Sequence, residues 1–200
     1  MRIGVDFDNT LICYDGLFHS LALERGLIPA GLPRDKTVIR DHIRARGGEQ
    51  DWILLQGLAY GTGIGGGTPF PGVTEFFETA RRQGHELFII SHKTQYPHKG
   101  ERVDLRQAAL GWLLDHQFLE RPEELGEHLF FAAEREDKIQ AINECGCDYF
   151  IDDLPDFLGM QGFAEQATLC LFDPGDNHLE FSLGPRFTSW DAARRQVLNA

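Results

Sequence analysis

The segment RIGVDFDNTLI, residues 2–12, places a short apolar strand directly before two aspartates. Ile3 and Val5 belong to the apolar run, and Asp6 and Asp8 follow it with one residue between them. Carboxylates this close repel each other, and burying one of them beside an apolar core is costly unless it is paired. The segment therefore predicts that positive charge gathers at this strand end.

The composition is that of an ordinary globular protein with an acidic surface. The chain has 200 residues, 42% of them hydrophobic, which suits one domain or one core domain with a modest insertion. Its 31 acidic and 19 basic residues give a formal net charge of -12. Such a surface repels anionic membranes and argues against a nucleic-acid partner, unless a local basic patch exists. No apolar run approaches the ~20 residues of a membrane span.

The cysteines indicate a reducing environment. None of the spacings among Cys13, Cys145, Cys147 and Cys170 matches the common zinc or redox pairs. The N-terminus has no signal-peptide pattern, so we expect reduced thiols and a cytoplasmic location. We interpret all four cysteines as small apolar side chains of the interior.

Strands and amphipathic helices alternate along most of the chain. The expected strands are 2–6, 86–90, 129–131, 148–151 and 168–172, and the helices between and after them are 73–83, 104–118, 137–144 and 189–198. This alternation predicts an α/β fold, a three-layer Rossmann-like parallel sheet with helices on both faces. Ligands of such sheets bind beyond the carboxyl ends of the strands.

Residues 14–70 interrupt the alternation. They contain three expected helices, 17–25, 35–46 and 51–59, followed by the glycine-rich segment GTGIGGG. We expect a small helical cap over 14–70, inserted after the first strand of a Rossmann-like core that comprises 1–13 and 71–200. The glycine-rich segment follows no strand and lacks the Lys-Ser/Thr ending of a phosphate-binding loop, so we interpret it as a hinge.

Polar side chains gather at or near the ends of the expected strands: Asp6, Asp8, Thr10, Ser91, His92, Lys93, Lys138, Asp152 and Asp153. If the strands are parallel neighbours, these groups converge on one crevice. Clustered carboxylates stay ionised together only with a cation among them, and oxygen ligands without cysteine or histidine predict Mg²⁺. One lysine, Lys138, adds positive charge but cannot alone neutralise so many carboxylates.

Four segments, in order along residues 3–156, resemble the motifs of the haloacid dehalogenase-like (HAD) superfamily. They are VDFDNTLI, LFIIS, DKIQAI and DYFIDDLPD. The resemblance implies that Asp6 is a nucleophile forming an aspartyl-phosphate and that Asp8 acts as general acid and base. Thr10 would support the loop, and Ser91 and Lys138 would bind the phosphoryl oxygens. Dehalogenase members lack the second aspartate, so its presence favours phosphoryl transfer.

The same resemblance implies a magnesium site. Mg²⁺ would be bound by Asp6, by the backbone carbonyl of Asp8 and by Asp153. Asp152 would orient Lys138, although it is the alternative metal ligand. These assignments rest on the family pattern.

A cationic loop follows the second motif and contains His92, Lys93, His98, Lys99 and Arg102. We expect part of it, His92 and Lys93 first, to bind an anionic group of the substrate. The alternative is a solvated loop with no binding role.

The resemblance therefore implies a Mg²⁺-dependent phosphatase that acts on a small phosphorylated metabolite through an aspartyl-phosphate. Alternatives on the same site are a phosphotransferase and a nucleotidase or nucleic-acid 3'-phosphatase. A different class is a non-catalytic phosphate-binding or receiver-like signalling domain. All the motifs lie on the core, so they name neither the substrate nor the oligomeric state.

Overall fold

The structure is a computed structural model that describes residues 1–199, and the chain forms two compact units. The first, which we call the sheet unit, comprises Met1–Ile12, Pro69–Lys93 and the chain from Phe118 onward. The second, the helical unit, comprises Cys13–Thr68 and Thr94–Gln117. The chain first leaves the sheet unit within β2 (Ile12–Cys13), returns within β3 (Thr68–Pro69), and leaves it a second time for Thr94–Gln117.

The sheet unit is built on six parallel strands in the order β5-β4-β1-β6-β7-β8. Their bounds are β1 Arg2–Val5, β4 Glu86–His92, β5 Leu129–Ala132, β6 Tyr149–Asp152, β7 Thr168–Phe172 and β8 Arg186–Phe187. The parallel α/β fold predicted from the sequence is confirmed. The central position of β1 between β4 and β6 brings the ends of three predicted strands together.

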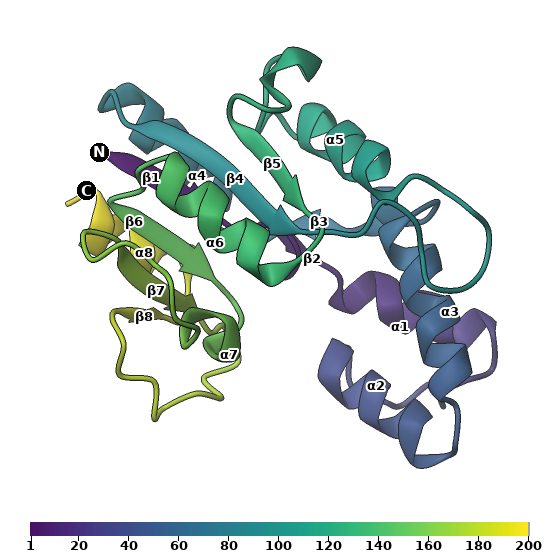
Figure 1. Cartoon of the computed structure of the whole chain (residues 1–200). Helices are drawn as coiled ribbons and strands as arrows, with labels where there is room; N and C mark the ends of the chain where they lie inside the picture. Colours follow the sequence, from purple (N-terminus) through teal and green to yellow (C-terminus); the bar gives the residue numbers. More distant parts are fainter. Residues whose placement is uncertain (200) are drawn as a thin grey trace. The chain divides into compact units, whose positions relative to one another are not determined.

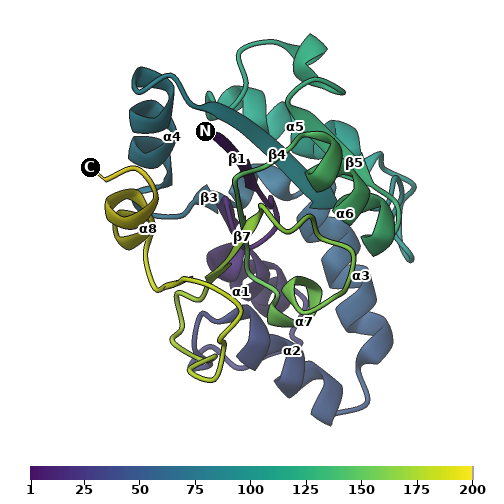
Figure 2. The same ribbon diagram turned by 60° about the vertical axis from the view of Figure 1, so that its left-hand side comes forward.

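Helices cover both faces of this sheet (Figures 1 and 2). One face carries α4 (Val73–Arg82) and α8 (Trp190–Val197), whose side chains Phe76 and Trp190 meet with ring centroids 4.9 Å apart. The other face carries α6 (Arg135–Glu144) and α7 (Pro155–Leu158), which bury a cluster that includes Phe150 and Phe157. Two apolar layers thus hold the strand ends in place.

The helical unit contains four helices, α1 Asp15–Glu24, α2 Lys36–Ala45, α3 Glu49–Tyr60 and α5 Leu105–Asp115, with a 3-10 turn at Ile64–Gly66. Phe18 stacks on Trp52 with ring centroids 4.9 Å apart. The Trp112 indole on α5 donates a hydrogen bond to the Gly67 carbonyl at 3.1 Å, which ties α5 to the glycine-rich segment. This compact unit therefore takes in α5 besides residues that the sequence assigned to a cap, and the predicted cap-and-core division stays a prediction.

Every helix and strand expected from the sequence is present, with ends that differ by a few residues. The sequence pattern missed the shortest elements: β2, β3, β8, α7 and the 3-10 turns at Ile64–Gly66 and Pro122–Glu124. The four cysteines are free thiols, and three of them are buried, as expected for apolar side chains. Within residues 1–199, no helix combines the length and the apolar character that crossing a membrane requires.

Candidate active site

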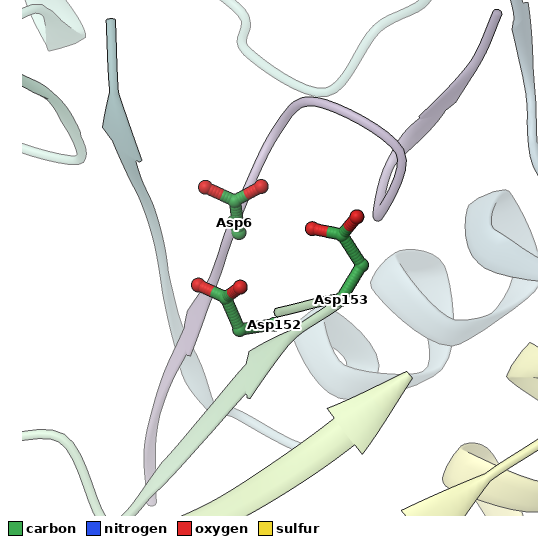
Figure 3. Close-up of side chains that lie close together, drawn as sticks. All are labelled: Asp6, Asp152 and Asp153. Carbon is green, nitrogen blue, oxygen red and sulfur yellow. The ribbon is translucent and has the colours of Figure 1, made fainter. Parts of the chain in front are cut away.

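Three carboxylates meet where β1 and β6 end (Figure 3). Asp6 directly follows β1, Asp152 is the last residue of β6, and Asp153 comes next. The two strands are parallel neighbours, and the Asp6 amide donates to the Ile151 carbonyl at 2.9 Å. One oxygen from each carboxylate lies within 4.8 Å of an oxygen of the other two. The convergence expected from the parallel topology is therefore present.

A buried lysine links two of these acids. Lys138, in the first turn of α6, donates to Asp6 Oδ1 and to Asp152 Oδ2, both at 2.6 Å. Its ammonium also lies 4.4 Å from the ring centroid of Phe157, within the apolar layer under α6. The sequence expectation that Asp152 contacts Lys138 thus has a geometric basis, although the roles of both residues stay predictions.

Burial and charge pull the pKa values at this site in opposite directions. The pKa of Asp6 is raised to about 6, because burial, together with repulsion by Asp152 and Asp8, outweighs the attraction of Lys138. For Lys138, burial alone would lower the pKa, but the carboxylates of Asp152 and Asp6 raise it above its usual value. The lysine is therefore a permanent cation, while Asp6 is poorly compensated by its own chain.

The carboxylate oxygens of this site differ in how many hydrogen bonds they accept from the protein. Asp152 accepts from Lys138 at Oδ2 and from the Leu154 amide at Oδ1, at 2.9 Å. Among the described residues, Asp6 Oδ2 receives only a long contact of 3.5 Å from the Thr10 hydroxyl. Since both Asp152 oxygens already accept hydrogen bonds, Asp152 is more fully engaged within the protein than Asp6 is.

The loop after β1 is a tight turn that fixes Asp8. The amides of residues 10–12 point at the Phe7 carbonyl, and Asn9 has a φ of 59°, a left-handed conformation that asparagine tolerates better than most residues. The Thr10 carbonyl accepts from the Trp190 indole at 3.1 Å, which anchors the turn to α8. Backbone contacts, rather than side-chain packing alone, therefore set the position of Asp8.

The end of β4 contributes two side chains from one face of the strand. Ser91 and Lys93 are both buried, and the exposed His92 between them contacts the Ala133 carbonyl at 2.8 Å. The Ser91 hydroxyl oxygen is buried without a hydrogen-bond partner among residues 1–199. The Lys93 ammonium lies 3.0 and 2.7 Å from the two oxygens of Asp8. The predicted binding role of His92 remains untested.

The acidic side chains of this cluster outnumber its basic ones. Four carboxylates face two ammonium groups, which leaves a formal charge of -2; the acids are Asp6, Asp8, Asp152 and Asp153, and the cations Lys93 and Lys138. A divalent cation would balance it, and a set made only of oxygen donors suits Mg²⁺. The residues present therefore fit the metal that the resemblance implies.

Sequence reasoning missed the pairing of Lys93 with Asp8. It assigned Lys93 to substrate binding and counted Lys138 as the only compensating lysine. The signal was available, because side chains two apart on a strand share a face, so Lys93 must lie on the face of Ser91. Two other members of the cationic loop contact neighbours in the helical unit: Lys99 donates to the Gln50 side chain at 3.2 Å, and Arg102 lies over the Tyr96 ring.

Comparisons with known proteins identify the fold. No family model matches the chain. A relative from Bacillus cereus named "Putative nucleotidase" is 26% identical over 198 residues, covering 95% of this chain and 94% of the relative. A HAD family hydrolase from Deinococcus radiodurans, solved with bound phosphate and sodium, superposes with a TM-score of 0.60 at 19% identity, covering 99% of this chain and 95% of that one.

A second solved structure, the HAD-hydrolase YfnB from Bacillus subtilis bound to magnesium, gives a TM-score of 0.54 at 14% identity over 100% of this chain and 98% of that one. The chain therefore has the fold of the HAD-superfamily hydrolases. The resemblance drawn from the four sequence motifs is confirmed at the level of the fold.

Proposed function

We propose that this protein is a Mg²⁺-dependent phosphatase that hydrolyses a small phosphorylated metabolite through an aspartyl-phosphate on Asp6. The observation that carries the proposal is the cluster of three carboxylates at the ends of β1 and β6, with Lys138 between two of them. The HAD fold and the nucleotidase named among its relatives support a phosphatase-type hydrolase.

In the first step, an oxygen of Asp6 attacks phosphorus while the bond from phosphorus to the leaving oxygen breaks. Asp8, in its acid form, gives its proton to that leaving oxygen. The Lys138 ammonium and the Ser91 hydroxyl donate to the non-bridging phosphoryl oxygens; the buried Ser91 oxygen, without a partner in residues 1–199, is available for this. The products are the free alcohol and phospho-Asp6.

In the second step, a water molecule attacks phosphorus and the bond to the Asp6 oxygen breaks. Asp8, now a carboxylate, accepts the proton of that water, which restores its acid form and releases inorganic phosphate. Mg²⁺, held by Asp6, Asp153 and the Asp8 carbonyl, would neutralise the charge that the cluster and the phosphate share. Asp152 would keep Lys138 in place.

The proposal is tested with purified protein, p-nitrophenyl phosphate and a panel of phosphorylated metabolites, each with Mg²⁺ and with EDTA. We expect turnover that EDTA abolishes and Mg²⁺ restores. Asp8→Asn should still form the phosphoenzyme but hydrolyse it slowly. Added alcohols separate the alternatives, since a phosphotransferase would form new phosphate esters. Absence of turnover across the panel would contradict an enzymatic role and favour a binding or receiver-like domain.

A nucleotidase is the second candidate, because the relative from Bacillus cereus carries that name and aligns over nearly the whole chain. Nucleoside 5'- and 3'-monophosphates and a 3'-phosphorylated oligonucleotide belong in the panel for this reason. A rate with nucleotides no higher than with sugar phosphates would remove this candidate. The net charge of -12 disfavours the oligonucleotide among these substrates.

A further inference from the structure

The Lys93 side chain is fixed at both ends. Its backbone amide donates to the Ala132 carbonyl at 2.9 Å, which continues the pairing of β4 with β5 by one residue. Its ammonium lies 5.3 Å from the ring centroid of the buried Phe7 and contacts both oxygens of Asp8. Only 3% of the Lys93 side chain is exposed, against 21% for Asp8. The lysine is therefore the rigid partner of this pair, and Asp8 is the one held.

We infer that Lys93 is a positioning residue that holds the Asp8 carboxylate in the orientation needed to accept the proton of the hydrolytic water. The inference rests on the proposed phosphatase function and adds a residue to it. An ammonium that contacts both oxygens holds the carboxylate in position through two charge-assisted contacts, at 3.0 and 2.7 Å. Misplacing a catalytic group by about 1 Å can cost about 10²-fold in rate, so such restraint has a measurable consequence.

The pair acts on the second step of the reaction. In that step the bond from water oxygen to phosphorus forms, the bond from phosphorus to Asp6 breaks, and the water proton moves to Asp8. Lys93 contacts both oxygens of the carboxyl group that takes up this proton. In the first step p-nitrophenolate leaves readily without receiving a proton, so that step depends less on the orientation of Asp8, and loss of Lys93 should slow dephosphorylation more than phosphorylation.

This role is distinct from the substrate-binding role that the sequence suggested for Lys93. A residue that only binds the substrate phosphate would raise KM when removed, with no build-up of phosphoenzyme. A residue that only supports the fold would lower the amount of folded protein and leave the kinetics of the folded fraction unchanged. A residue that positions Asp8 for the second step makes phosphoenzyme accumulate.

The test compares wild type with Lys93→Met, which keeps an unbranched side chain but removes the ammonium. With p-nitrophenyl phosphate we expect kcat to fall about tenfold to a hundredfold, KM to fall with it, and a burst of about one p-nitrophenolate per enzyme. Because hydrolysis of one common intermediate then limits the rate, phenyl phosphate should give the same kcat. Lys93→Arg should recover part of the rate, since it restores a cation.

Arg195→Met, at an exposed site on α8 outside the four sequence motifs, is the control that removes one positive charge. In an Asp8→Asn background, Lys93→Met should have little further effect on hydrolysis. A raised KM without a burst, or an equal effect in both backgrounds, would overturn the inference. If wild type turns over without any phosphoenzyme on Asp6, the proposed mechanism itself fails. That result differs from a failure of the Lys93 inference alone, in which wild type still forms the phosphoenzyme.

Discussion

Two buried aspartates stand in the same place relative to the sheet and behave in opposite ways. Asp6 directly follows β1, and Asp173 directly follows β7. Burial raises the pKa of Asp6 to about 6 despite Lys138. Burial would also raise the pKa of Asp173, but the amides of Asn177 and His178, helped by Arg186, lower it on balance.

The two aspartates differ in which groups donate hydrogen bonds to their carboxylates. Asp173 accepts at both oxygens, from the Asn177 amide at 3.0 Å and the His178 amide at 2.8 Å in its own loop and from Arg186 of β8 at 2.8 Å. Asp6 shares one lysine with Asp152 and has one weakly contacted oxygen. A carboxylate saturated by its own chain stabilises a loop, whereas an under-compensated one can bind a cation and attack a substrate.

Among the substitutions that test this comparison, Asp6→Asn should have the largest effect. The amide keeps the shape of the side chain but is a poor nucleophile, so we expect turnover to fall by at least about a thousandfold. Folding should be nearly unaffected, because repulsion among Asp6, Asp152 and Asp8 is relieved while Lys138 keeps Asp152. Steady-state kinetics and urea denaturation measure the two effects. A variant with close to wild-type turnover would show that Asp6 is not the nucleophile.

Lys138→Met tests whether the acidic cluster depends on its shared cation. The variant leaves two buried carboxylates without their ion pair, so we expect a loss of about 3–5 kcal/mol in the free energy of unfolding. Combining it with Asp152→Asn should recover part of that loss, since one uncompensated charge is then gone. Urea denaturation without metal gives both values. An unchanged stability in the single variant would argue that solvent already compensates these carboxylates.

Asp173→Asn tests the aspartate whose two oxygens both accept hydrogen bonds within the protein. We expect a loss of about 2 kcal/mol at pH 7, because charged hydrogen bonds in the loop are weakened, and turnover within about twofold of wild type. Folding lowers the pKa of Asp173, so its ionised form stabilises the protein at pH values above the unfolded-state pKa of about 3.9. This stabilisation is lost as the pH falls through the folded-state pKa.

The gap in stability between wild type and Asp173→Asn should therefore narrow below about pH 4. Denaturation curves between pH 7 and pH 3.5 measure it. A gap that stays constant over this range would mean that the charge of Asp173 contributes nothing and that only its shape matters.

Asp153→Asn gives the smallest expected change. It removes one charged oxygen ligand, so the Mg²⁺ concentration for half-maximal activity should rise by about tenfold, equal to about 1.4 kcal/mol in binding. Asp156→Asn, an exposed acid three residues on, is the matched control and should leave that concentration unchanged. A Mg²⁺ titration of activity compares them. Equal requirements in both variants would assign the metal to other ligands.

Much of the fold is visible in local sequence patterns. The strand expected at 168–172 is β7, Thr168–Phe172, and the helix expected at 73–83 is α4, Val73–Arg82. Hydrophobic periodicity is a local property, so it survives without knowledge of the partners. The two-residue β8 has no such signal, because its place in the sheet comes only from pairing Arg186 with Leu171 of β7.

The acidic cluster was also predictable in outline, since parallel strands send their carboxyl ends to one edge. The sequence by itself determined the alternation of strands and helices and the kinds of groups that meet at that edge. Only the tertiary structure determined which charged side chains pair with one another. Only there does Lys93 reach Asp8, does Lys138 lie between Asp6 and Asp152, and does Asp173 find donors within its own loop. Pairings between distant residues depend on distance and burial, and neither is encoded in a local pattern.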